Sequence, residues 1–350
     1  MDNDGCYTAP DFFKDFKCKC GDCRQSCCEG WDISVSEDEY FRIMSLECSE
    51  DMQKRIDRAF YIPKDASAER YALLNHDWLG RCPMRAEDGL CALQVEKGEA
   101  LVPNICRLYP RSYWGDLGEA TVSDSCEQVL EMLAHRTAPI AFININGPAA
   151  GAARKDAAET DVRRECIRII GKNGSCVRDR LLEIGRYLVK AEPEENDFPV
   201  HLKIMEDFLS TYQKLSLSIE EYCSEALRSL SGLTLDVFSE KKTAFLNRFP
   251  FWENFIGNVY VNHFFYEKFP YSDKRENEED EFVSVCGMHS FLDFLLIGNL
   301  KKLVTEDDLI DLVSMAFRVI EHTSFYYNSH VLLKKYGYDT PSKAESLILF

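Results

Sequence analysis

The chain has 350 residues, of which 45% are hydrophobic, and a formal net charge of −18. A chain of this length can bury a sizeable core without disulfide bridges, and its acidity argues against a nucleic-acid partner, because phosphate binding needs clustered lysine and arginine. The opening residues Met1 to Gly5 have neither the basic nor the apolar region of a secretory signal, and the most apolar run, SFLDFLLIGNL from Ser290, is too short to span a bilayer. We therefore expect a cytoplasmic protein with no membrane role.

Cysteine is the most informative residue near the start of the chain. Eight of the fifteen cysteines form one spaced pattern, with four in the segment FKCKCGDCRQSCCEGW and four that follow singly. Thiolates three to four residues apart on a tight loop can converge on one soft ion or cluster, and later cysteines can complete the shell. The predicted ligands are Cys18, Cys23, Cys27, Cys28, Cys82, Cys91, Cys106 and Cys126. Cys20 also lies within reach of Cys23 and could replace Cys18.

The identity of the bound group stays open at this point. Disulfides are disfavoured, because the chain lacks a secretory signal and adjacent Cys27 and Cys28 are badly placed to bridge each other. Zinc commonly uses two CxxC pairs, whereas iron–sulfur clusters tolerate scattered ligands. Eight thiolates are enough for two four-ligand sites, or for one cluster and some structural cysteines. The cysteines outside the pattern are expected to be small buried hydrophobes or inert surface thiols; they are Cys6, Cys48, Cys166, Cys176, Cys223 and Cys286.

The remaining elements predict a mainly α-helical protein. The capping box Ser36-x-x-Glu39 begins one helix and Thr305-x-x-Asp308 another, after which apolar residues recur at helical spacing up to Ile320. Residues 201–215 and 219–230 have the same periodicity, and ENEEDEF at 276–282 is expected to be a solvated acidic loop. A stretch of glycine, proline and small residues divides the chain. We predict a cysteine-rich loop-and-helix domain over 1–143, a linker over 144–161 and a helical domain over 162–350.

Four segments resemble the successive motifs of the flagellin lysine N-methylase family, which shares its cysteine signature with small zinc- or iron-chelating domains. The first contains the clustered cysteines followed by GW, and the second contains DGLC and CRLYPR, from Asp88 to Arg111. The third is SDSCEQVLEML around Cys126, although Glu127 follows that cysteine where the family pattern has proline. The fourth, FWENFIGNVYVNHFFYEKFPY, resembles the family's helical C-terminal motif.

The resemblance implies methyl transfer from S-adenosylmethionine to lysine ε-amines of flagellin, in a protein that carries an iron–sulfur cluster of the 4Fe-4S kind. The sequence has no glycine-rich nucleotide turn after a strand. It also lacks the CxxxCxxC spacing of radical enzymes, because Gly30 occupies the position that would complete it after Cys23 and Cys27. The mode of cofactor binding is therefore not readable from a known motif.

A lysine must lose its proton before it attacks a methyl group, so the site must desolvate the amine or supply a base. Tyr109 and Arg111 are the candidate catalytic residues, and Trp31 and Arg107 are the candidate cofactor-binding residues, through cation–π contact and carboxylate pairing. Each of the four also has an ordinary structural interpretation, as a core anchor, a packed turn or an ion pair.

Histidines and aromatic residues of the C-terminal half are expected to be core residues first. The histidines are His263, His289 and His322, and the aromatic set is Phe245, Phe249, Trp252, Phe255, Tyr260 and Phe264. Two alternatives to a methylase remain: a zinc- or iron-chelating or redox module, and a zinc-stabilised helical interaction protein.

Overall fold

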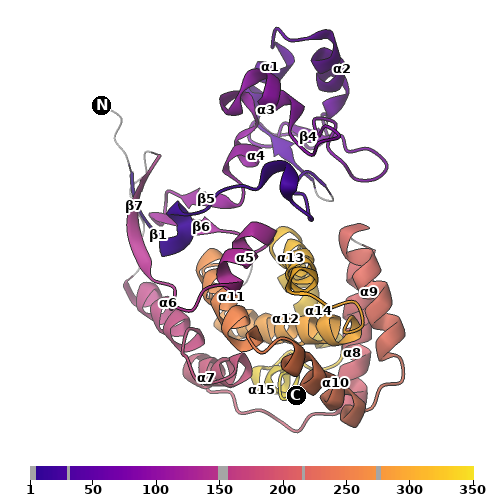
Figure 1. The fold of residues 1–350 in the computed structure, drawn as a ribbon. Coiled ribbons are helices and arrows are strands. Elements are labelled where there is room, and N and C mark those ends of the chain that lie inside the picture. The colour runs from indigo at the N-terminus through magenta and orange to yellow at the C-terminus, as the bar shows by residue number, and fades with distance from the viewer. Residues whose placement is uncertain (1–4, 30–31, 149–156, 215–216, 273–276) are drawn as a thin grey trace. The chain divides into compact units, whose positions relative to one another are not determined.

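A computed structural model describes residues 5–29, 32–148, 157–214, 217–272 and 277–350. The chain forms two compact units. The cysteine unit comprises Lys17–Pro110, and the body comprises Met1–Phe16 together with Arg111–Phe350 (Figure 1). The cysteine unit is thus an insertion between two segments of the body. Fifteen α-helices in the described residues confirm the mainly helical class.

The body contains a four-stranded sheet in the order β5–β6–β1–β7. Strand β1 is parallel to β6 and antiparallel to β7, and β5 is antiparallel to β6. The register pairs Gly5 with Gly147 and Pro10 with Phe142. The strands are β1 (Gly5–Pro10), β5 (Arg111–Trp114), β6 (Glu119–Val122) and β7 (Phe142–Gly147).

This sheet explains why the boundaries of the two compact units differ from those of the predicted domains. Because β1 pairs with β6 and β7, residues 111–147 join the helical body, and the predicted 1–143 domain does not form one compact unit. The predicted linker 144–161 overlaps the end of β7 and the start of α6. Its residues 149–156 lie outside the described residues.

Most helices of the body surround α12, which contacts α7, α8, α9, α10, α13, α14 and α15 (Figure 1). The body helices are α5 (Glu127–Ala134), α6 (Ala157–Ile170), α7 (Val177–Val189), α8 (Phe198–Tyr212), α9 (Leu217–Leu230), α10 (Leu235–Arg248), α11 (Trp252–Tyr266), α12 (Glu278–Gly298), α13 (Glu306–His322), α14 (Phe325–Lys335) and α15 (Pro341–Ser346). Helix α12 is apolar all round, as expected for a helix buried on every side.

Helix α12 corrects two sequence expectations. The acidic segment is not a loop: Asn277 caps the helix, Glu278–Glu281 form its first turn, and Glu281 is buried. Residue 276 lies outside the described residues. The apolar run from Ser290 belongs to a helix of 21 residues, which is long and apolar enough to cross a membrane, but 94% of its most apolar window is buried inside the protein.

The cysteine unit has a smaller core of its own. Its three-stranded antiparallel sheet has the order β2–β4–β3, and its buried core includes Ile43, Ile56 and Leu93. The elements are β2 (Ser34–Val35), β3 (Phe60–Tyr61), β4 (Ala72–Leu74), α1 (Glu37–Met44), α2 (Glu50–Ala59), α3 (Ala92–Lys97) and α4 (Asn104–Leu108). The predicted capping box is present at the start of α1.

The predicted core residues of the body are buried except for His322. The aromatic set from Phe245 to Phe264 has at most 4% exposure at any member. His263 and His289 are also buried. His322 is largely exposed, although its Nε2 atom lies 2.8 Å from Ser125 Oγ. Among the other cysteines, Cys166, Cys223 and Cys286 are buried, and Cys6 is exposed.

Candidate functional site

Two loops of the cysteine unit meet through their glycines. Gly21 and Gly89 approach so closely that a Cβ on Gly21 would lie 2.6 Å from the Asp88 carbonyl oxygen, and Gly89 has a φ of +80°. A larger residue at either position would separate the loops or strain the backbone. The glycine of the DGLC motif therefore serves to place Cys91 against the first cysteine segment.

Backbone hydrogen bonds hold the cysteine-bearing loops together. The Cys82 N–H donates to the Cys28 carbonyl at 2.9 Å, and Arg85 and Cys91 form an isolated antiparallel bridge. The Arg85 guanidinium is ion-paired with Glu29. As a result, Cys28, Cys82 and Cys91 are near enough to one another, and to Cys106 on α4, for their charges to interact.

Cys28, Cys82, Cys91 and Cys106 form the four-cysteine set, whose thiols differ in how readily they ionise. A hydrogen bond from Cys27 lowers the pKa of Cys28 to about 6. Burial raises the pKa of Cys82 to about 12 and also raises that of Cys91. Backbone N–H groups donate to both buried sulfurs, that of Met84 to Cys82 Sγ at 3.3 Å. Such N–H···S bonds stabilise thiolates and tune clusters that they ligate.

The other predicted ligands are placed differently. Cys18 and Cys20 are exposed, and the Cys20 N–H donates to Cys18 Sγ at 3.3 Å, so both remain candidates for one position. Cys23 and Cys27 are half-buried members of the same segment. Cys126 belongs to the body, where it precedes α5.

Three of the four predicted catalytic and cofactor residues, Arg107, Tyr109 and Arg111, lie within five consecutive residues where the cysteine unit ends and the body resumes in the sequence. Tyr109 ends α4 in the cysteine unit, whereas Arg111 begins β5 in the body with its guanidinium 5.5 Å from the Phe16 ring. Arg107 is exposed and donates to Asn104 Oδ1 at 2.8 Å. Trp31 lies outside the described residues. The roles predicted for these residues stay predictions.

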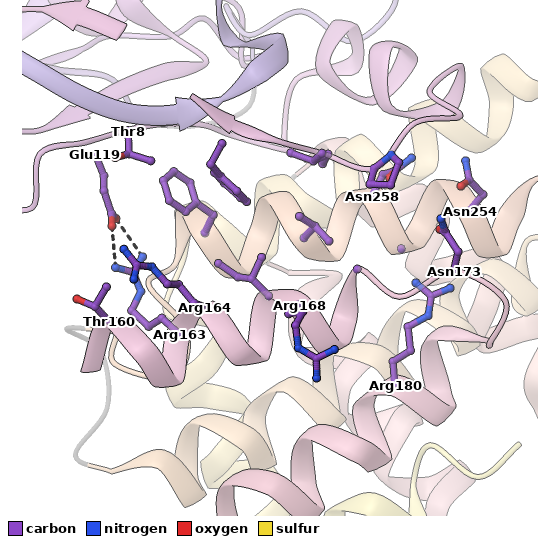
Figure 2. A pocket seen from close by; sticks show the side chains of 18 residues that line it. Thr8, Glu119, Thr160, Arg163, Arg164, Arg168, Asn173, Arg180, Asn254 and Asn258 are labelled. Atoms are coloured by element: carbon purple, nitrogen blue, oxygen red, sulfur yellow. Dashed lines mark hydrogen bonds and ion pairs between the residues drawn. The ribbon is translucent and has the colours of Figure 1, made fainter. Parts of the chain in front are cut away.

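The body contains a pocket of about 530 Å³ between the sheet, α6 and α11 (Figure 2). Its volume falls within the ~300–1,000 Å³ that is usual for small-molecule sites. Helix α6 and the turn after it contribute Thr160, Arg163, Arg164, Ile167, Arg168, Gly171 and Asn173, and α11 contributes Asn254, Gly257, Asn258, Val261 and Phe265. Thr8, Glu119, Phe142 and Arg180 complete most of the wall.

The arginines of the pocket are largely neutralised by partners. Arg163 forms two bonds to Glu119, at 2.9 and 3.0 Å, with both side chains about nine-tenths buried (Figure 2). Arg168 pairs with Glu165, and Arg164 with Asp161.

Arg180 instead donates to the carbonyl oxygens of Ile170 and Ser175, which fixes the turn between α6 and α7. The pocket therefore offers donor groups without a large excess of positive charge.

Asparagines four residues apart on α11 attach this wall to the segment between β6 and β7. Asn254 and Asn258 donate to the Arg136 carbonyl, at 2.7 and 3.3 Å, and Asn262 donates to the Val122 carbonyl at 2.7 Å. Asn258 and Asn262 are buried, and buried amides with such defined partners make this part of the wall rigid.

The sequence contains a signal for this pocket along one face of α6. Residues 160, 163, 164, 167 and 168 recur at helical spacing and form one face of α6 that is polar except for Ile167, and Gly171 follows directly after the helix. That face is typical of a solvent-exposed helix, so only its partner across the pocket, α11, distinguishes it.

The fold and the two sites define a mainly helical protein with a thiol-rich inserted unit and a small-molecule-sized pocket. Residues 163–347, more than half of the chain, match the model of the FliB lysine N-methylase C-terminal domain. The chain belongs to this family, as the motifs predicted. The match includes α6 from Arg163 onward and all of α11, which form two walls of the pocket.

Curated relatives give partial matches. The chain is similar to proteins named lysine-N-methylase from Salmonella choleraesuis and Salmonella typhimurium, each 27% identical over 106 residues, which cover 30% of this chain and 26% of the relative. It is also 26% identical over 106 residues to the flagellar biosynthetic protein FliU of Salmonella muenchen, covering 30% of this chain and 62% of that protein. The similarity thus spans about a quarter of the length of the two methylases. No solved structure matches the chain.

Proposed function

We propose that this protein is a cytoplasmic lysine N-methylase that transfers methyl groups from S-adenosylmethionine to lysines of flagellin. The observation that carries the proposal is the family match over residues 163–347. The name of the FliU relative supports a substrate in the flagellum.

We place the methyl donor in the pocket between the sheet, α6 and α11. S-adenosylmethionine would supply an electrophilic methyl group there. The paired arginines and the asparagines offer donors for its carboxylate and hydroxyl groups, and Phe142 and Phe265, 4.6 Å apart, offer aromatic surface. Because three of the four arginines have carboxylate partners, the pocket can also accept a positively charged sulfonium.

We further propose that the four-cysteine set holds an iron–sulfur cluster. The four cysteines come singly from separate segments of the chain. Iron–sulfur clusters tolerate such scattered ligands, whereas structural zinc sites commonly use paired cysteines. The N–H···S bonds to Cys82 and Cys91 would hold these ligands.

Binding of S-adenosylmethionine tests where the donor binds. The chain purified under anaerobic conditions should bind it in a calorimeter, and Ile167→Trp, which fills the pocket from α6, should weaken binding at least tenfold. Ile62→Trp is the matched control, because Ile62 is 49% exposed and does not line the pocket. Equal binding by Ile167→Trp would move the donor site elsewhere.

Methyl transfer tests the activity itself. Purified flagellin and labelled S-adenosylmethionine should yield labelled flagellin, with the label on lysine. No transfer by protein with stoichiometric iron and sulfide would refute the methylase and favour the metal-chelating alternative.

A further inference from the structure

A second group of possible metal ligands lies inside the body, among residues that do not line the pocket. Asp124 follows β6, His263 is on α11 and Glu321 is on α13. One ligand atom from each lies within 4.8 Å of the others. All three residues are buried, with exposures of 0%, 0% and 6%. They form the buried triad.

The buried triad contains two carboxylates with little to neutralise them. The Glu321 Oε1 atom accepts from the Asp124 N–H at 3.4 Å and lies 3.1 Å from His263 Nδ1. Asp124 Oδ2 is buried and has no hydrogen-bond partner in the described structure. No lysine or arginine of the described residues is ion-paired with either carboxylate. Burying two ionised acids side by side is costly unless a cation compensates them or a bound proton neutralises one of them.

Neighbouring groups hold the outer atom of each member. The Tyr326 hydroxyl oxygen lies 2.6 Å from His263 Nε2, and the Asn262 side-chain amide donates to Asp124 Oδ1 at 2.8 Å. Ser123 donates to Glu321 Oε2. This leaves His263 Nδ1, Glu321 Oε1 and Asp124 Oδ2 as the inner atoms. Metal-binding histidines and carboxylates are commonly oriented in this way by a second set of hydrogen bonds.

We propose that Asp124, His263 and Glu321 bind a divalent transition-metal ion. One imidazole and two carboxylates are a donor set that suits borderline or hard ions such as Zn²⁺ or Mn²⁺. The sulfur ligands of the four-cysteine set suit soft ions and clusters instead. The ion joins the turn after β6 to α11 and α13. Its role is therefore to fix the segment that precedes Cys126.

Manganese distinguishes this site from the cysteines, because thiolates are poor ligands for Mn²⁺. Titration of the full chain with Mn²⁺, followed by the electron paramagnetic resonance signal of the free ion, should show one tightly bound ion per chain. Addition of Mn²⁺ should also raise the Tm of the protein, measured by the loss of its helical circular dichroism signal on heating. Glu321→Gln and Asp124→Asn should each weaken Mn²⁺ binding at least tenfold. Glu345→Gln is the matched control, because Glu345 is equally buried but lies outside the buried triad.

The wild-type protein alone can overturn the proposal. If it binds no Mn²⁺ and neither Mn²⁺ nor Zn²⁺ shifts its Tm, the buried triad is not a metal site. Undiminished binding by a folded Asp124→Asn or Glu321→Gln protein also refutes it. Asp124→Asn keeps the size and shape of the side chain, which gives a second test if Glu321→Gln does not fold.

Discussion

The ion pair between Arg163 and Glu119 joins α6 to β6 across the pocket, and its removal should destabilise the body strongly. In Arg163→Met, the Glu119 carboxylate loses both of its 2.9 and 3.0 Å bonds while it remains about nine-tenths buried. Breaking one partner of a buried pair costs roughly 3–5 kcal/mol. Because some solvent reaches both side chains, we expect a loss near the lower limit, about 3 kcal/mol.

A neighbouring pair on the same helix provides the control. Arg168 bonds to Glu165 at 2.6 Å, but the two side chains are 58% and 33% exposed. Exposed pairs of this kind contribute about 0–1 kcal/mol. Arg168→Met should therefore change stability much less than Arg163→Met, although the substitution is the same.

Urea unfolding followed by far-ultraviolet circular dichroism measures the difference, because most helices belong to the body. A loss of about 3 kcal/mol corresponds to a decrease in Tm of roughly 6–12 °C for a unit of this size. The double variant Glu119→Gln with Arg163→Met should regain part of the stability, since the unpaired charge is then absent. Losses for Arg163→Met and Arg168→Met that agree within about 0.5 kcal/mol would refute the reasoning.

Three further predictions concern the core, pH and metal content. Gly298→Ala should destabilise the body by about 1–3 kcal/mol in urea unfolding, because the new Cβ would lie 2.6 Å from the Ala226 backbone on α9. Gly287→Ala on the same helix should change stability by less than about 1 kcal/mol, since its Cβ would lie 3.1 Å from the end of the Leu333 side chain and in ordinary contact with the Phe208 ring, and equal effects would argue against this packing. Burial raises the pKa of Glu345 from 4.5 to about 7, so this carboxyl stays neutral at pH 5 but ionises at pH 8 in the folded protein. Stability should therefore fall as pH rises from about 4.5 to about 7 and change little above that, and Glu345→Gln should stabilise the protein by roughly 1–2 kcal/mol more at pH 8 than at pH 5; a gain that is the same at both pH values would contradict this assignment. Cys91→Ala and Cys106→Ala should lose iron or zinc in elemental analysis while Cys223→Ala, a buried cysteine of α9, keeps it; unchanged metal in both would remove Cys91 and Cys106 from the ligand set.

Local sequence signals predicted the elements that depend on local interactions. Both capping boxes, at Ser36 and Thr305, are present. The periodic apolar residues after Thr305 are the buried face of α13. The prediction of a loop for the acidic segment before Phe282 was wrong. Charge alone does not distinguish a solvated loop from the first turn of a helix, where carboxylates are stabilised by the helix dipole.

Elements and sites that need distant partners were not predictable in this way. Strand β1 has six residues and depends on β7, more than 130 residues later, for its hydrogen bonds. Spacing identified the cysteines as a set, but only the contact of Gly21 with Gly89 shows how two of their loops meet. The buried triad combines residues 124, 263 and 321, so no local motif contains it.

The placement of β1 also determines an order of events during synthesis. At roughly 5–20 residues per second, β1 waits about 7–26 s for β7 to be made. The whole cysteine unit, with its own hydrophobic core, is completed within that interval. Phe16 and Arg111, which flank it, are in contact in the finished body. The ribosome therefore presents the thiols of the inserted unit to the cell before the sheet whose strands flank the insertion in the sequence can form.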